Sequence, residues 1–372
     1  MTVKPLVRLG ELGQSPWFDY ITRDLLQTGE LQRLIAQDGL RGMTTNPTIF
    51  EKAVAGSDRY DADIRSLADS ELKPGDIFET LAVADVRQAC DMFLPTYDAT
   101  EGRDGFVSIE VSPELARDAE ATVREARRLW EAVDRPNVMI KIPGTKEGLP
   151  AITRCLARGL NVNVTLLFSV ERHRQVMEAF LVALEQRRGR RDPINRIASV
   201  ASFFVSRVDT KLDPMLEQAG SPAAGELRGK IAIANALVAY EAFQQTFSGA
   251  RWEALAREGA RVQRPLWAST STKDPAYPDV YYVEALIAPD TVNTLPPETF
   301  AAYGDHGRPQ VRITEQTIAE AKQRLSALAG LGFNLQDVTQ ALETEGVQKF
   351  SASFTTLLAG VGQKAMALSG AH

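Results

Sequence analysis

The sequence contains few of the residues that bind metals or form disulfide bonds. Only two cysteines are present, Cys90 and Cys155, and their wide separation without Cys-x-x-Cys spacing indicates neither a disulfide framework nor a zinc site. The three histidines form no His-x-x-x-His pair, and no carboxylate motif for a metal is visible. We therefore expect a protein that binds no metal.

Long apolar runs and blocks of like charge are also absent. No run approaches the roughly 18 apolar residues of a membrane span, and the N-terminus lacks the apolar core of a signal peptide. The formal net charge is -6, and the one basic cluster, residues 187–191, is short and follows a predicted helix, where such side chains are usually solvated. We expect a cytoplasmic protein that binds neither membrane nor nucleic acid.

What is present is an alternation of strand and helix patterns in a composition that is 44% hydrophobic and 24% charged. Nearly all the predicted strands are separated by helical patterns, which implies parallel βαβ units of the α/β class. Eight of them predict a closed (β/α)8 TIM barrel, with extra helices at about residues 313–370, in a single domain over residues 1–372. The predicted strands are residues 17–21, 40–46, 105–111, 137–144, 161–168, 197–205, 264–270 and 290–295. The main predicted helices are residues 22–37, 61–72, 77–94, 114–132, 147–158, 170–186, 223–247, 315–328 and 335–368.

The fourth predicted strand contains a lysine within an apolar run that ends in Pro-Gly. Such a run, bounded by turn residues, is typical of a buried strand, and lysine is rarely buried unless it is paired or chemically used. Lys141 could simply be an edge-strand lysine that prevents aggregation. It could instead be an amine that desolvation keeps neutral for attack on a carbonyl carbon.

Strand parity favours the second alternative, because it collects polar side chains on one face of three consecutive strands. In a closed parallel barrel this face is the lumen, where polar groups near the strand C-termini are typically catalytic. The polar residues on it are Ser108, Glu110, Lys141, Asn161, Asn163 and Thr165, and by the same parity Asp19, Thr44 and Asn46 could join them.

An amine and two carboxylates around one lumen suit imine chemistry, in which protons move at each step. Carboxylates near Lys141 stabilise a charged ammonium, however, and oppose the neutral amine. Either desolvation must outweigh this effect, or one of Asp19 and Glu110 must stay protonated. The sequence leaves both alternatives open.

Three motifs on predicted strands carry a family resemblance: Thr-Thr-Asn-Pro at 44–47, Ile-Lys-Ile-Pro at 140–143 and Asn-Val-Thr-Leu-Leu-Phe-Ser at 163–169. Together and in this order they resemble transaldolase, in particular the longer bacterial type, which stands alone or is fused to glucose-6-phosphate isomerase. The likeness covers about residues 15–210. It implies a cofactor-free, class I aldolase-like barrel with its Schiff-base lysine on strand 4.

The resemblance also implies a reaction of the non-oxidative pentose phosphate pathway. A dihydroxyacetone unit would pass from sedoheptulose 7-phosphate or fructose 6-phosphate to glyceraldehyde 3-phosphate or erythrose 4-phosphate. Lys141 would form the imine, and Asp19 would take the proton from the C4 hydroxyl. Glu110 and Thr165, with a water between them, would shuttle protons. The partners would be sugar phosphates, and the protein a monomer or homodimer.

Substrate binding is expected from a second group of residues. The segment at 202–207 resembles the family's stretch that ends in a phosphate-binding arginine, here Arg207. Many relatives have a second arginine after strand 7, where this chain has Trp-Ala-Ser-Thr-Ser-Thr-Lys at 267–273, and Lys273 can replace it as a point charge. The expected substrate-binding residues are Thr44, Asn46, Asn163, Ser202, Arg207, Ser269 and Lys273.

Two other functions stay open. A simple class I aldolase would release dihydroxyacetone, although Asp19 with Glu110 favours transfer. A silent sugar-phosphate-binding barrel would be expected to have lost one of the reactive groups. Among the remaining features, His173 is expected at the surface, and Phe350 and Phe354 could anchor the C-terminal helices on the barrel. The resemblance raises a gating role for that last helix.

Overall fold

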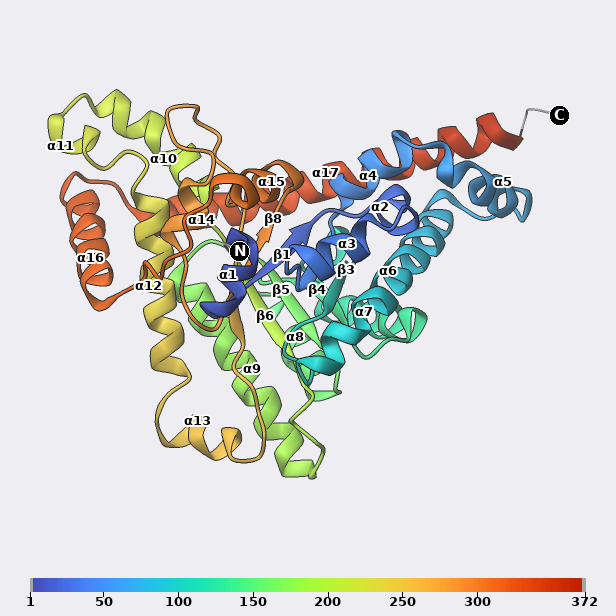
Figure 1. The fold of residues 1–372 in the computed structure, drawn as a ribbon, viewed down its shortest axis with the longest axis horizontal. Helices are drawn as coiled ribbons and strands as arrows, with labels where there is room; N and C mark the ends of the chain where they lie inside the picture. The colour runs from blue at the N-terminus through green and yellow to red at the C-terminus, as the bar shows by residue number, and fades with distance from the viewer. Residues whose placement is uncertain (1–2, 370–372) are drawn as a thin grey trace.

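Eight short strands of mostly buried residues pair in parallel and in sequence order, and β8 pairs with β1 to close a barrel (Figure 1). The structure is a computed structural model, and it describes residues 3–369. It confirms the expected (β/α)8 architecture. The strands are β1 (Gln14–Asp19), β2 (Gly42–Thr44), β3 (Phe106–Glu110), β4 (Val138–Pro143), β5 (Val162–Leu167), β6 (Ser199–Phe204), β7 (Arg264–Ala268) and β8 (Thr291–Leu295).

Helices connect the strands and cover the outside of the barrel. Thr22, Asn46 and Ser169 cap α2, α4 and α9, because each side chain accepts a hydrogen bond from the backbone N–H three residues on. No helix within residues 3–369 has the length and apolar character to span a membrane. The helices are α1 (Pro5–Glu11), α2 (Arg23–Gln27), α3 (Glu30–Gln37), α4 (Pro47–Ala55), α5 (Asp61–Asp69), α6 (Pro74–Ala99), α7 (Ala119–Val133), α8 (Leu149–Ala157), α9 (Val170–Arg190), α10 (Ser206–Ala219), α11 (Pro222–Gly225), α12 (Ile231–Thr246), α13 (Gly249–Ala256), α14 (Tyr281–Ala285), α15 (Pro297–His306), α16 (Glu315–Gly330) and α17 (Leu335–Ser369), with 3-10 turns at Asp58–Tyr60 and Pro113–Leu115.

The segment after β6 differs from the predicted pattern. α10 begins directly after the strand, where no helix is predicted, and the helix predicted over residues 223–247 is divided into α11 and α12. The helical conformation is interrupted at Gly229, which has φ +68°. The N–H of Gly229 donates to Asp213 of α10 at 2.9 Å. A residue in the left-handed conformation does not continue a helix, so α12 begins only after Gly229. The hydrogen bond to Asp213 ties the start of α12 to α10.

His173 lies in the interior, and the prediction that it is at the surface is wrong. The residue is fully buried on α9, and its ring lies 5.8 Å from that of Phe203 between centroids. The residues next to His173 in the sequence are charged and suggest an exposed position. His173 nevertheless belongs to a buried stripe at helical spacing that continues with Val176, Met177 and Phe180. This stripe packs toward β6 and α12.

The end of the barrel opposite the carboxyl ends of the strands is closed by a buried ion pair. Arg264, the first residue of β7, donates to Asp104 at 2.9 Å and to Ser15 of β1 at 2.8 Å. The side chains of Arg264 and Asp104 are almost completely buried. Removing one partner of a buried, hydrogen-bonded ion pair is costly, so this pair stabilises the end of the barrel that faces away from the cavity.

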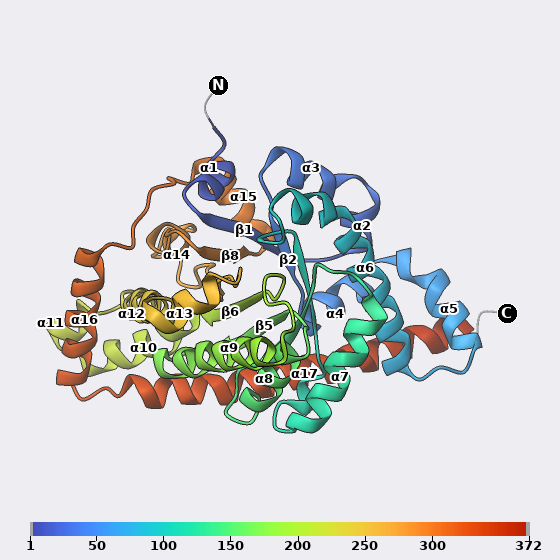
Figure 2. The ribbon, with the colours of Figure 1, turned by 90° about the horizontal axis from the view of Figure 1, so that it is seen from below.

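The last helix, α17, crosses the carboxyl ends of the strands. It is 35 residues long and runs from the side of α10 and α16 to α5, as both views show (Figures 1 and 2). Gly346 allows it to approach the barrel, because a Cβ atom there would lie 3.0 Å from Leu166 Cδ2. Leu166 has φ +62° at an irregularity near the end of β5, so its side chain meets α17 and departs from the outward set predicted for that strand.

Candidate active site

A cavity of about 390 Å³ opens at the carboxyl ends of the strands, beneath α17. Its size is ordinary for a small-molecule site, and in a barrel of this kind the active site is expected at this end. Of the eleven residues predicted for the site, nine line the cavity. These are Asp19, Thr44, Asn46, Lys141, Thr165, Ser202, Arg207, Ser269 and Lys273.

Lys141 occupies the centre of β4 with 4% of its surface exposed. Its Nζ donates to the carbonyl oxygen of Thr45 at 3.0 Å and lies 3.4 Å from Glu110 Oε2. The ring of Phe350 lies on another side, 5.6 Å from Nζ to the ring centroid. The amine is therefore held between one carbonyl, one carboxyl group and one aromatic face.

Glu110 is placed beside Lys141 by the pairing of β3 and β4, in which the two residues are register partners. It lines a smaller neighbouring cavity of about 60 Å³ instead of the larger one. Burial raises the pKa of its carboxyl to about 7, although Lys141 opposes the shift. Neither carboxyl oxygen has a hydrogen-bond partner within the described residues, so both can exchange protons with a reacting group.

Asn163 is fully buried and lies below the cavity, not on its surface. Its amide nitrogen donates to Ser108 Oγ at 3.0 Å, and its amide oxygen accepts a hydrogen bond from Ser202 at 2.7 Å. These contacts confirm that polar residues of β3, β5 and β6 share the lumen. They make Asn163 a support for Ser202, which does line the cavity.

Asp19 is the last residue of β1, and its carboxyl group accepts a hydrogen bond from the first of two linked threonine hydroxyl groups. Thr44 donates to Asp19 Oδ1 at 2.6 Å, and Thr44 Oγ1 is 2.6 Å from Thr294 Oγ1. A threonine has one hydroxyl proton, so Thr294 is the donor to Thr44 when Thr44 donates to Asp19. Burial raises the pKa of Asp19, while Lys141 and Thr44 oppose this effect.

Thr165 and Asn46 complete the inner part of the cavity. Thr165 is fully buried, and its hydroxyl has no hydrogen-bond partner among residues 3–369. Asn46 lines both cavities, while its side-chain oxygen caps α4 by accepting the N–H of Ile49 at 3.0 Å. Its amide nitrogen is therefore the group that remains for a ligand.

The outer part of the cavity contains cationic and hydroxyl side chains. Arg207, in the first turn of α10, lies over the ring of Phe204 and forms no ion pair with any described residue. Lys273 donates to Ser271 Oγ at 2.7 Å. Ser269 has φ +56°, and its carbonyl accepts the N–H of Ser206 at 3.0 Å, which ties the loop after β7 to the start of α10. Such an arrangement is suited to an anion.

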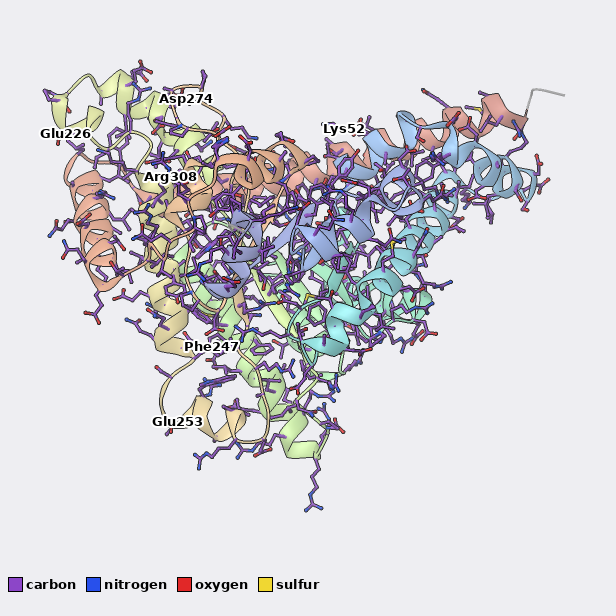
Figure 3. The ribbon with its side chains drawn as sticks, in the orientation of Figure 1. Lys52, Glu226, Phe247, Glu253, Asp274 and Arg308 are labelled. Carbon is purple, nitrogen blue, oxygen red and sulfur yellow. The ribbon has the colours of Figure 1, made fainter. Side chains whose placement is uncertain are left out.

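Several cavity residues were not predicted from the sequence. Thr294 lies on β8 and was accessible to the same parity argument, but Lys349 and Phe350 come from α17, some 200 residues beyond Lys141 in the chain. Lys52 comes from α4; Figure 3 shows it on the same upper side of the molecule as Asp274, in the loop after β7. Within residues 3–369, no group of three or more His, Cys, Asp or Glu side chains could hold a metal ion.

A buried amine beside a carboxyl group whose pKa burial raises to about 7 is suited to forming imines, as lysine-dependent aldolases do. Comparison with known proteins gives the particular family. The model of the family Transaldolase/Fructose-6-phosphate aldolase matches residues 16–361, and the chain belongs to this family.

Curated relatives are similar over nearly their whole length. A transaldolase of Acidothermus cellulolyticus is 53% identical over 357 residues, which cover 96% of this chain and 96% of that protein. A transaldolase of Thermobifida fusca is 51% identical over 97% of this chain and 98% of its own length. A transaldolase of Trichodesmium erythraeum is 44% identical over 99% of this chain and all of its own length.

Proposed function

We propose that the protein is a transaldolase, which moves a dihydroxyacetone unit from a ketose phosphate to an aldose phosphate through an imine on Lys141. The donors are fructose 6-phosphate and sedoheptulose 7-phosphate, and the acceptors are erythrose 4-phosphate and glyceraldehyde 3-phosphate. The observation that carries the proposal is the position of Lys141 Nζ, 3.4 Å from Glu110 Oε2, beside a cavity that also contains Asp19 and Arg207. The family supports the same activity.

Imine formation begins with attack of the neutral Lys141 amine on the C2 ketone. A C–N bond forms, and the ketone oxygen becomes a hydroxyl group after it gains a proton. Protonation of this hydroxyl group expels it as water and leaves the iminium ion. Glu110 is suited to both proton transfers, because a carboxyl group with a pKa of about 7 is present in both forms at neutral pH. The Thr165 hydroxyl, which has no other partner in the described structure, is the proposed relay.

Carbon–carbon cleavage needs a base at the C4 hydroxyl. Asp19 takes that proton, the C3–C4 bond breaks, and its electron pair flows into the iminium ion to give an enamine. The hydrogen bond from Thr44, itself supported by Thr294, holds the carboxylate in place. The aldose phosphate then leaves, and the protonated Asp19 is ready to return the proton to the new aldehyde oxygen.

Transfer requires that the enamine outlasts the exchange of aldehydes. Phe350 covers the lysine from α17 with only 6% of its own surface exposed. This contact restricts the access of water to the reacting carbon atoms. At the outer end, Arg207, Ser269 and Lys273 bind the phosphate group that the donor and then the acceptor each carry. Asn46 and Ser202 contact hydroxyl groups.

The experiment that tests this function separates transfer from simple cleavage. The protein is incubated with fructose 6-phosphate, with and without erythrose 4-phosphate, and sedoheptulose 7-phosphate, glyceraldehyde 3-phosphate and free dihydroxyacetone are measured. We expect sedoheptulose 7-phosphate in a 1:1 ratio to glyceraldehyde 3-phosphate, and about one cleavage per protein molecule without acceptor. Continuous release of dihydroxyacetone without acceptor would show an aldolase. No reaction of either kind would favour a barrel that only binds sugar phosphates.

A further inference from the structure

Helix α17 presents one of its faces to the mouth of the cavity. Residues four apart lie on the same side of a helix, so Glu345, Lys349 and Ser353 form a row. Glu345 is ion-paired with Lys211 of α10 at 2.6 Å, and Ser353 accepts a hydrogen bond from Thr48 of α4 at 2.9 Å. Lys349 lies midway between these two anchors, about 6 Å along the helix from each, given a rise of 1.5 Å per residue.

The residues that anchor α17 lie on the same helices as two other cations of the cavity. Arg207 precedes Lys211 by one turn of α10, and Lys52 follows Thr48 by one turn of α4. Lys52, Arg207 and Lys349 all line the cavity. The row on α17 thus bridges the helix that provides Arg207 and the helix that provides Lys52, with Lys349 over the opening.

The charges of the cavity are unbalanced in a protein of net charge -6. Its lining contains five cations and two carboxylates, Asp19 and Glu298. The four cations at the outer end form no ion pair within residues 3–369, unlike Lys211, which pairs with Glu345. An unpaired cluster of one sign at an opening raises the local concentration of an anionic ligand. The four are Lys52, Arg207, Lys273 and Lys349.

α17 is also held firmly enough to position a side chain. Toward its end, Lys364 pairs with Asp61 at 2.7 Å and donates to the carbonyl oxygens of Val54, in the last turn of α4, and Ser57, which follows that helix. Phe350, next to Lys349, is buried against the catalytic lysine. A cation on a rigid helix is more precisely placed than one on a loop, which is the setting of Lys273.

We propose that Lys349, with Lys52 of the same cavity lining, binds the phosphate dianion of the sugar phosphate together with Arg207. The C-terminal helix is then part of the substrate site, and the protein selects phosphorylated sugars partly through α17. This inference rests on the proposed function, because it takes the anion to be the phosphate of the same substrate. Lysines from α4 and α17 would then add to the charge that Lys273 provides after β7.

The test compares Lys349→Gln and Lys349→Arg with Lys146→Gln. Lys146 is an exposed lysine that follows β4 and does not line the cavity. Its replacement by Gln therefore makes the same change in net charge as Lys349→Gln but away from the cavity. Binding of inorganic phosphate is measured by calorimetry and by the phosphate-dependent rise in melting temperature, neither of which requires catalysis. The ratio of kcat/KM for fructose 6-phosphate to that for unphosphorylated fructose is measured in parallel.

Lys349→Gln removes one charged hydrogen bond to the phosphate. We therefore expect phosphate binding to weaken, and the kcat/KM ratio to fall, by about tenfold to a hundredfold. Lys349→Arg should stay within about threefold of the unmodified protein, and Lys146→Gln within about twofold. If Lys349→Gln behaves like Lys146→Gln in both measurements, the inference is wrong. If phosphate binding weakens as expected but no lysine adduct or transfer is ever detected, the phosphate site stands and the proposed function fails.

Discussion

Lys141 Nζ and Glu110 Oε2 lie 3.4 Å apart on adjacent strands, and the Glu110 carboxyl has a pKa raised to about 7. Burial is the main cause, and the nearby amine opposes it. A carboxyl group with a pKa of about 7 carries a proton in part of the molecules at neutral pH, so Glu110 is suited both to donating and to accepting a proton beside the amine.

Replacement of the carboxyl group by an amide should separate catalysis from binding. Glu110→Gln removes the proton donor and acceptor, so kcat should fall by about 10²–10⁴-fold. The pH profile of kcat/KM should lose an inflection near pH 7, because Glu110 has that pKa in the free protein. Steady-state kinetics from pH 5.5 to 9 check this. An inflection that persists unchanged in the variant would assign it to another group.

The same variant should be more stable at alkaline pH. The folded protein holds the Glu110 proton up to about pH 7, against 4.5 for the ordinary value, so ionisation costs stability as pH rises through this window. At pH 8, Glu110→Gln should raise the free energy of unfolding by about 1–3 kcal/mol. At pH 5 the gain should largely vanish. Urea denaturation at the two pH values provides the measurement, and an equal effect at both would contradict the assignment.

Asp19→Asn should stop the reaction after imine formation. The amide can still fit between Thr44 and the substrate, but it cannot take the proton from the C4 hydroxyl. We expect kcat to fall by about 10²–10⁴-fold. Borohydride should trap the intact hexose phosphate on Lys141, and mass spectrometry distinguishes it from a dihydroxyacetone adduct. A variant that still gives mainly the smaller adduct would exclude Asp19 as the base.

Phe350→Leu tests the cover that α17 places over the lysine. The shorter side chain should admit water, so the rate of dihydroxyacetone release relative to transfer should rise several-fold, with a stability loss of about 1–2 kcal/mol. Phe354→Leu is the matched control, because Phe354 lies one turn on, packs against Phe78 and does not line the larger cavity. Equal product ratios in the two variants would show that the cover has no role in protecting the intermediate.

His173 should make the protein sensitive to acid. Burial lowers the pKa of its ring to about 4, so the unfolded chain binds the proton more readily and stability falls as pH drops from about 6.5 toward 4. Between pH 8 and pH 5 the loss should be about 2 kcal/mol, and His173→Leu should remove it. The exposed His306→Gln is the control. A slope that survives in His173→Leu would assign acid sensitivity to other groups.

The inner part of the site could be predicted from the sequence because it depends on local rules. Alternation along a strand is enough to place Asp19, Glu110 and Lys141 in one lumen once the barrel is assumed. The same rule would have included Thr294 on β8. It fails near Leu166, where an irregular pairing changes the direction of the side chain.

The outer part depends on contacts between distant segments, which no local pattern contains. The periodicity of residues 335–368 predicts a helix but not that Lys349 and Phe350 line the cavity at the end of the barrel. His173 shows a different failure, since its charged neighbours suggest solvent although its own position belongs to the apolar stripe. Burial of a helix face is decided by packing.

Borohydride trapping with fructose 6-phosphate would show whether Lys141 forms an imine with the sugar. The protein is reduced in the presence of the sugar, and the adduct is located by intact mass and peptide mapping. We predict a dihydroxyacetone-sized adduct on Lys141 alone, absent from Lys141→Met, because among residues 3–369 this is the only lysine buried in the lumen beside Glu110. No adduct in folded protein, or an adduct on one of the lysines at the mouth, would contradict the account.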